Sequence, residues 1–108
     1  MIRPLKKRYI GFRVTSSLLP SRREVLTLVL MELHALGHDR DKMLRVRVLD
    51  YDGATGVGML LCDHKSVAKI RDAFRSVQEK SHGQTTLHMI GVSGTIRALK
   101  RKFLLTQR

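Results

Sequence analysis

Two hydrophobic periodicities follow one another along the 108 residues of this chain, and their order constrains the fold more than any other feature. Strict alternation of apolar and polar residues predicts strands, and apolar residues at three- and four-residue spacing predict helices. The predicted strands cover residues 7–14, 43–49, 54–62 and 84–92, and the predicted helices cover residues 22–36, 64–80 and 96–105. This order predicts an α+β, ferredoxin-like split βαβ sandwich, in which two helices cover one face of a four-stranded antiparallel sheet and a C-terminal helix is added. We expect residues 1–108 to form a single domain.

Local signals set the ends of the predicted elements. Ser21 and Glu24 form a capping box that should start the first helix, and Gly37 should end it. Asp63 can cap the second helix. Residues 50–53 read as the turn of a hairpin between the second and third strands.

The chain carries a large excess of positive charge. Twenty-one Lys and Arg residues against nine Asp and Glu give a net charge of +12, which attracts nucleic acid, an anionic membrane or an acidic protein. Cys62 is the only cysteine, so an internal disulfide and a cysteine-based zinc site are both excluded, and a reducing, cytoplasmic location is expected. The longest apolar stretch, residues 25–31, is too short to span a membrane.

The face of the sheet that lacks helices is predicted to be basic. Its expected side chains come from the first two strands (Lys7, Tyr9, Arg13, Arg45 and Arg47) and from the third (Gly56, Gly58 and Leu60). Because only Tyr9 among them is aromatic, contact with the phosphates of a folded RNA, or with another protein, fits better than base-by-base reading of a single strand. A basic face that is simply solvated is the alternative.

A second basic cluster lies near the C-terminus. Arg97, Lys100 and Arg101 are three and four residues apart and should share one helix face. Residues 93–95 open this helix with two hydroxyls and free amides, which suit either a phosphate oxygen or ordinary helix capping.

No combination of residues predicts an active site. His34 and His38, followed by Asp39 and Asp41, have a spacing that could hold a metal, but Gly37 interrupts the helix between the histidines. No histidine pairs with a nucleophile at a recognisable spacing, and no glycine-rich nucleotide loop joins a strand to a helix. We therefore expect no catalytic residue, metal or cofactor in this chain.

Three stretches resemble archaeal ribonuclease P protein component 2 and its eukaryotic relative, a subunit shared by ribonucleases P and MRP. They are residues 7–14, which contain YIGFRV, residues 48–74, and VSGTIR at residues 92–97, which is the most specific. The resemblance implies that the chain binds the catalytic domain of ribonuclease P RNA. It also implies pairing with a TIM-barrel-like protein subunit, with two copies of each. The holoenzyme cuts precursor tRNA at the mature 5′ end, and the RNA with its bound Mg²⁺ performs the hydrolysis.

The residues expected to bind RNA combine the two basic clusters. They are Lys7, Arg8, Arg13, Arg45, Arg47, Ser93, Gly94, Thr95, Arg97, Lys100 and Arg101. The protein partner is expected to meet either the wide apolar arc of the first helix, which includes Leu26 and Leu30, or Leu60 with the nearby glycines.

Two other classes of function were weighed. A ribosomal or general RNA-binding protein of the same fold would have the same composition, and only the context of residues 93–97 separates it from a ribonuclease P subunit. A small enzyme of this fold, such as an acyl-phosphate hydrolase, needs a catalytic Asn, and the chain contains no Asn.

Overall fold

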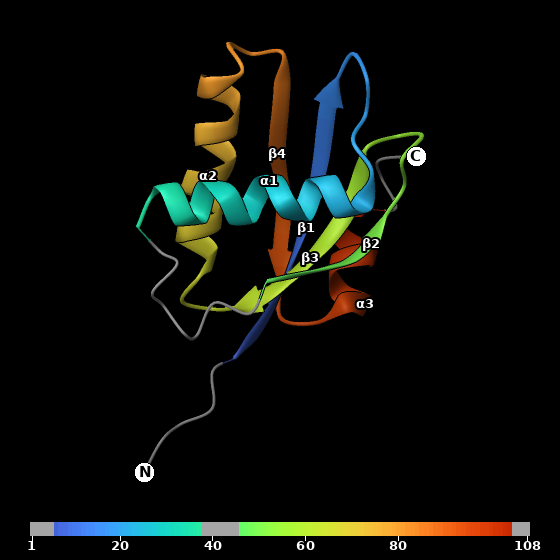
Figure 1. The fold of residues 1–108 in the computed structure, drawn as a ribbon. Helices are drawn as coiled ribbons and strands as arrows, with labels where there is room; N and C mark the ends of the chain where they lie inside the picture. Colours follow the sequence, from blue (N-terminus) through green and yellow to red (C-terminus); the bar gives the residue numbers. More distant parts are fainter. Residues whose placement is uncertain (1–5, 38–45, 105–108) are drawn as a thin grey trace.

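The computed structural model describes residues 6–37 and 46–104. The elements in chain order are β1 (Lys7–Ser16), α1 (Arg22–Ala35), β2 (Arg47–Tyr51), β3 (Val57–Asp63), α2 (Val67–Lys80), β4 (Thr85–Ser93), α3 (Ile96–Leu99) and a π-helical turn, η1 (Lys100–Leu104). The strands form one antiparallel sheet in the order β2-β3-β1-β4, with α1 and α2 in front of it (Figure 1). The predicted ferredoxin-like fold is confirmed.

Both ends of α1 follow the local signals, whereas the start of α2 does not. The Ser21 Oγ accepts from the Glu24 amide and the Glu24 carboxylate accepts from the Ser21 amide, each at 3.2 Å. Gly37, with φ +85°, adopts the left-handed conformation that ends a helix. The Asp63 Oδ1 accepts from the amides of Lys65 and Ser66 at 2.9 and 3.0 Å. These bonds close a turn over residues 63–66, so α2 starts at Val67 with Ser66 as its N-cap. The prediction that Asp63 caps this helix is therefore wrong.

The core lies between the sheet and the two front helices, and Phe12 is at its centre. The fully buried Phe12 ring stacks on Tyr51 of β2 at 6.1 Å and meets Phe74 of α2 edge to face at 6.2 Å. The Tyr51 hydroxyl donates to the Pro20 carbonyl at 2.8 Å, which ties β2 to the start of α1. One aromatic group therefore joins two strands and one helix.

The predicted facing of the third strand is wrong. Gly58 pairs with Phe12 and Leu60 with Ile10, so both point toward the front helices, and Leu60 is fully buried. Met59 and Leu61 point the other way. Because residues 57–62 are apolar at most positions of both parities, their alternation cannot identify the buried face, and only the register with β1 does.

The hairpin turn is also displaced from the prediction. β2 continues through Asp50 to Tyr51, and the turn runs from Asp52 to Gly56, whose amide donates to the Asp52 carbonyl at 2.7 Å. A register shift between Val48 and Asp50 accounts for the difference.

The opposite side of the sheet, here called the second face, is partly covered, contrary to expectation. Figure 1 shows α3 behind the sheet. Leu99 of α3 is fully buried and Met59 is 3% exposed, yet neither belongs to the core beneath α1 and α2. Since α3 contacts β1 and β4, the C-terminal helix builds a small second core on this face.

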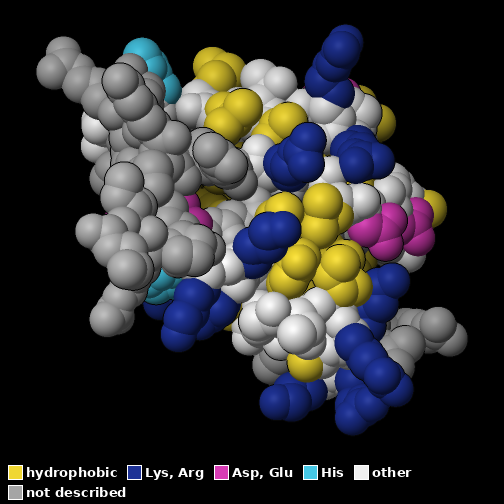
Figure 2. Space-filling view, turned by 90° about the horizontal axis from the view of Figure 1, so that it is seen from below, with side chains coloured by type: hydrophobic (Ala, Val, Ile, Leu, Met, Phe, Trp, Pro, Cys, Tyr) yellow, Lys and Arg dark blue, Asp and Glu magenta, His cyan; other side chains and the backbone are white. Residues whose placement is uncertain are grey.

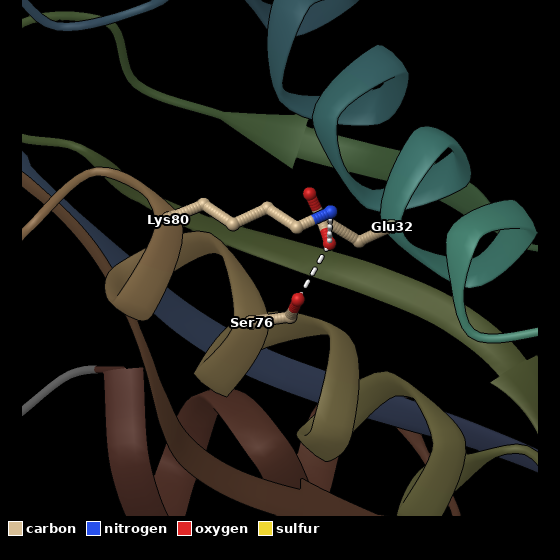
Figure 3. A network of polar contacts seen from close by, with 3 residues as sticks. All are labelled: Glu32, Ser76 and Lys80. Atoms are coloured by element: carbon tan, nitrogen blue, oxygen red, sulfur yellow. Dashed lines mark hydrogen bonds and ion pairs between the residues drawn. The ribbon is translucent and has the colours of Figure 1, made fainter.

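A polar contact joins α1 to α2 above the core. The Glu32 carboxylate accepts from the Ser76 hydroxyl at 2.6 Å and pairs with the Lys80 ammonium at 3.1 Å (Figure 3). The Ser76 hydrogen bond, assisted by Lys80, lowers the pKa of Glu32 below its usual 4.5 although partial burial opposes this.

A methyl group at Gly58 should destabilise the fold. A Cβ there would lie 2.6 Å from Phe12 Cζ and 2.7 Å from the Asp50 carbonyl oxygen, so the ring or the strand must move. We expect Gly58→Ala to lower the free energy of unfolding by about 1–3 kcal/mol, measured by urea denaturation. Gly53→Ala, where a Cβ meets nothing within 4 Å, is the matched control. Equal stability of the two variants would contradict this packing.

The Glu32 contact predicts a pH dependence of stability. Because the folded-state pKa is below 4.5, the carboxylate stabilises the fold above that pH and loses its effect as pH falls through the folded value. We expect Glu32→Gln to cost roughly 1 kcal/mol at neutral pH, with the difference from wild type shrinking below pH 4.5. The exposed Glu79→Gln is the control, and a pH-independent difference for Glu32→Gln would count against the contact.

Candidate nucleic-acid interface

Basic side chains gather where the strands of the sheet meet α3. β1 and β2 begin at this end, β3 and β4 finish there, and α3 starts beside them at the lower end in Figure 1. We call this surface the basic end, defined as Lys6, Lys7, Arg8, Arg47, Lys65, Arg97, Lys100 and Arg101; all are exposed except Arg8, which is half-buried. Figure 2, seen from below, shows Lys and Arg around hydrophobic areas, with acidic side chains confined to small spots.

Asp63, an acidic residue at this end, is turned into the protein. It is 7% exposed, and besides the two amide bonds its carboxylate accepts from the Ser66 hydroxyl at 2.9 Å. A carboxylate held this way is committed to the turn that leads into α2. Within residues 6–37 and 46–104 the cations around it form no ion pair, and their charge is available to a polyanion.

The sheet register places a row of side chains across the second face at the basic end. Arg47 lies opposite Leu61, Leu61 opposite Tyr9, and Tyr9 opposite Ser93. Lys7 is on the same side of β1, two residues from Tyr9. Three of the predicted site residues, Lys7, Arg47 and Ser93, are therefore brought together here.

Arg8 approaches α3 from the other side of β1. Its Nη1 donates to the Lys7 carbonyl at 2.8 Å and would lie 3.6 Å from a Cβ at Gly94. Arg8 and Gly94, which are 86 positions apart in the sequence, thus lie side by side.

The hydroxyls that open α3 are engaged in capping. The Thr95 Oγ1 accepts from the Ala98 amide at 3.1 Å, and the Ser93 Oγ accepts from the Thr95 amide at 3.4 Å. The capping interpretation is confirmed, while phosphate binding by these residues stays a prediction. Arg97, Lys100 and Arg101 follow on the exposed surface of the helix.

Two predicted residues are not part of this surface as described. Arg13 is on the second face, but it is four residues further along β1 than Tyr9, which is about 13 Å in a strand. Its Nε is buried and lacks a hydrogen-bond partner within the described part of the chain. Arg45, like His38, Asp39 and Asp41, lies outside the described residues.

Sequence reasoning missed Lys6 and Lys65. The His64 amide donates to the Lys6 carbonyl at 2.8 Å, which joins the start of β1 to the turn after β3. Lys65 lies two residues after Asp63, in the turn that follows the end of β3, and this position was the available signal for it.

Nucleophilic and metal chemistry find little support in the described residues. Burial, with Asp63 nearby, raises the pKa of the Cys62 thiol to about 11, so the sulfur is a protonated core atom. Within residues 6–37 and 46–104 there is no group of three or more His, Cys, Asp or Glu able to hold a metal. No helix in the same ranges is long and apolar enough to cross a membrane.

Comparison with known proteins identifies the family of this chain. The sequence model of the Rpp14/Pop5 family matches residues 8–104. The chain is 34% identical over 100 residues to a protein of Pyrococcus horikoshii, covering 92% of this chain and 83% of that protein. It is 31% identical to a protein of Methanosarcina mazei, covering 92% and 84% of the two chains. Both relatives bear the name ribonuclease P protein component 2. The extent of these matches shows that the chain belongs to the Rpp14/Pop5 family.

Proposed function

We propose that this chain is an RNA-binding protein subunit of ribonuclease P that supports the catalytic RNA in removing the 5′ leader from precursor tRNA. The observation that carries the proposal is the basic end, a group of cations at one end of the sheet in a chain whose relatives are named as ribonuclease P components. Those names favour this function over that of a ribosomal or general RNA-binding protein.

The proposed mechanism is electrostatic support. Folding an RNA active site brings phosphates together, and their mutual repulsion opposes the compact form. Fixed Arg and Lys side chains lower that repulsion and reduce the free Mg²⁺ that the RNA needs. In this proposal the protein contributes no catalytic residue and binds no cofactor itself, and the RNA uses the Mg²⁺. The assembly works in the cytoplasm.

The proposed protein partner is a ribonuclease P subunit of TIM-barrel-like fold, with two copies of each chain in the complex. Leu60 is excluded from that contact because it is fully buried. On α1, Leu26 packs against the core, whereas Leu30 is 45% exposed beside it. We assign Leu30 to the partner contact.

Reconstituted cleavage of precursor tRNA tests the function. We expect the chain to lower the Mg²⁺ concentration at which the ribonuclease P RNA and its other subunits reach half-maximal rate. Arg97→Gln, Lys100→Gln and Arg101→Gln together should reverse much of this gain. They should also reduce the slope of log affinity against log salt by roughly 2–3, since each lost phosphate contact contributes about 0.9.

The control removes the same charge elsewhere. Arg23, Arg71 and Arg75 are exposed on α1 and α2, away from the basic end, and their change to Gln also leaves a net charge of +9. If both triple variants lose affinity and salt slope equally, RNA attraction is a property of net charge and the assigned surface is wrong. Cleavage with an unchanged Mg²⁺ requirement in the absence of the chain would reject the function itself.

A charge at Leu30 should weaken binding of the protein partner. Leu30→Glu places a carboxylate in an apolar contact, and we expect affinity to fall at least tenfold in a titration with the partner subunit. The free chain should keep its thermal stability, since the position is exposed. Met31→Glu, at 63% exposure and about 100° around the helix, is the control. Unchanged affinity for Leu30→Glu would mean that the partner binds another surface of the chain.

A further inference from the structure

We propose that Tyr9 is a stacking platform for one unpaired nucleobase of the bound RNA. The inference rests on the proposed function, in which RNA binds the basic end, and it assigns a distinct contact within that surface. The phosphate contacts described above account for attraction to any folded polyanion. A ring that stacks on a base adds a contact that depends on an unpaired nucleotide at one position.

The surroundings of Tyr9 are those of a base-stacking site. The ring is half-buried on the second face, in the row of side chains that begins at Arg47, and it lies between Leu61 on β3 and Ser93 on β4. Leu61 is likewise half-buried, so the two side chains form a partly exposed apolar surface one strand spacing wide, about 5 Å. The facing predicted from the sequence alone put Leu60 here, and the true register is what gives Tyr9 its apolar neighbour.

The hydroxyl of Tyr9 serves no structural purpose among the described residues. Within the part of the chain that the structure describes, it makes no hydrogen bond, whereas the hydroxyl of Tyr51 donates to Pro20. Tyr51 thus acts as a core residue through both its ring and its hydroxyl. Among the described residues, Tyr9 forms neither a ring contact with another aromatic residue nor a hydrogen bond through its hydroxyl, which is consistent with a role at the surface.

Cations flank the platform on two sides. Arg47 is next to Leu61 in the row, about 10 Å from Tyr9, and Lys7 is about 7 Å along β1. Both are exposed, and neither has an ion-pair partner among the described residues. A base on the ring therefore has cations within reach of its own and the neighbouring phosphates.

The platform has room for a single base. The next row inward is formed by Gly11 and Met59, both buried, with Leu99 of α3 fully buried on the same face. A strand of stacked bases cannot continue across a surface that the C-terminal helix occupies. The ligand class is accordingly one unpaired nucleotide of a folded RNA. Stacking accepts any of the four bases, because each has a π-face.

Tyrosine emission provides a direct test, because the chain has two Tyr and no Trp. In Tyr51→Phe, which keeps the ring on Phe12, Tyr9 is the only emitter. We expect saturating ribonuclease P RNA to quench the Tyr9 emission, measured as fluorescence intensity corrected for absorption by the RNA. A stacked base quenches the ring by direct contact.

Affinity measurements complete the test. We expect Tyr9→Leu to bind the RNA about tenfold or more weakly with an unchanged salt slope, and Tyr9→Phe to bind within about twofold of wild type. Arg47→Gln, as the matched control, should lower the salt slope by about 1. Thermal unfolding of free Tyr9→Leu checks that the fold is intact, and the emission measurement needs no change at Tyr9.

The outcomes separate the two proposals. Unchanged Tyr9 emission at saturation, or wild-type affinity in Tyr9→Leu, overturns the stacking platform while RNA binding stands. Failure of the wild-type chain to bind the RNA at all overturns the proposed function, and the platform with it. A reduced salt slope in Tyr9→Leu would mean that the substitution displaced the neighbouring cations, and it would equally reject stacking.

Discussion

The fit of the Phe12 ring against Gly58 is the contact on which the rest of this structure depends. A fully buried Phe contributes about 1.5–3 kcal/mol by leaving water, and this one also contacts Tyr51 and Phe74. Since a side chain at Gly58 would occupy the space of the ring, β1 and β3 can pair only in the register that puts glycine opposite phenylalanine. The contact thereby sets the alignment of the two central strands.

That alignment also determines which side chains are neighbours on the exposed second face. A strand alternates with a period of two, so a slip of one residue would exchange the two faces of β3. With Phe12 opposite Gly58, Leu61 comes next to Tyr9 on the second face, and Arg47 of β2 comes next to Leu61. The position of exposed residues at the basic end thus follows from packing on the far side of the sheet.

Local chemistry predicts much of this fold, and tertiary packing decides what remains. The Ser21–Glu24 capping box and the glycine at the end of α1 need only neighbouring residues, and both were predictable. The facing of β3 was not, because its apolar residues occur at both parities. Nor could the sequence indicate that Leu99 would be buried on the second face, since an amphipathic helix does not specify which surface it covers. Sequence spacing is enough to predict that Arg97, Lys100 and Arg101 share one helix face, whereas the proximity of Arg8 to Gly94 required the sheet.

The separation of acidic from basic residues explains how a chain of charge +12 combines stability with a polyanion-binding surface. Glu24, Glu32, Asp52 and Asp63 each accept hydrogen bonds that cap a helix, join two helices or close a turn. These four acids stabilise the fold through hydrogen bonds, and none of them forms an ion pair with a cation of the basic end within the described residues. Repulsion among such cations destabilises the free protein, and a bound polyanion relieves it. The same charges that weaken the isolated chain should therefore make its folded state more stable when RNA is bound.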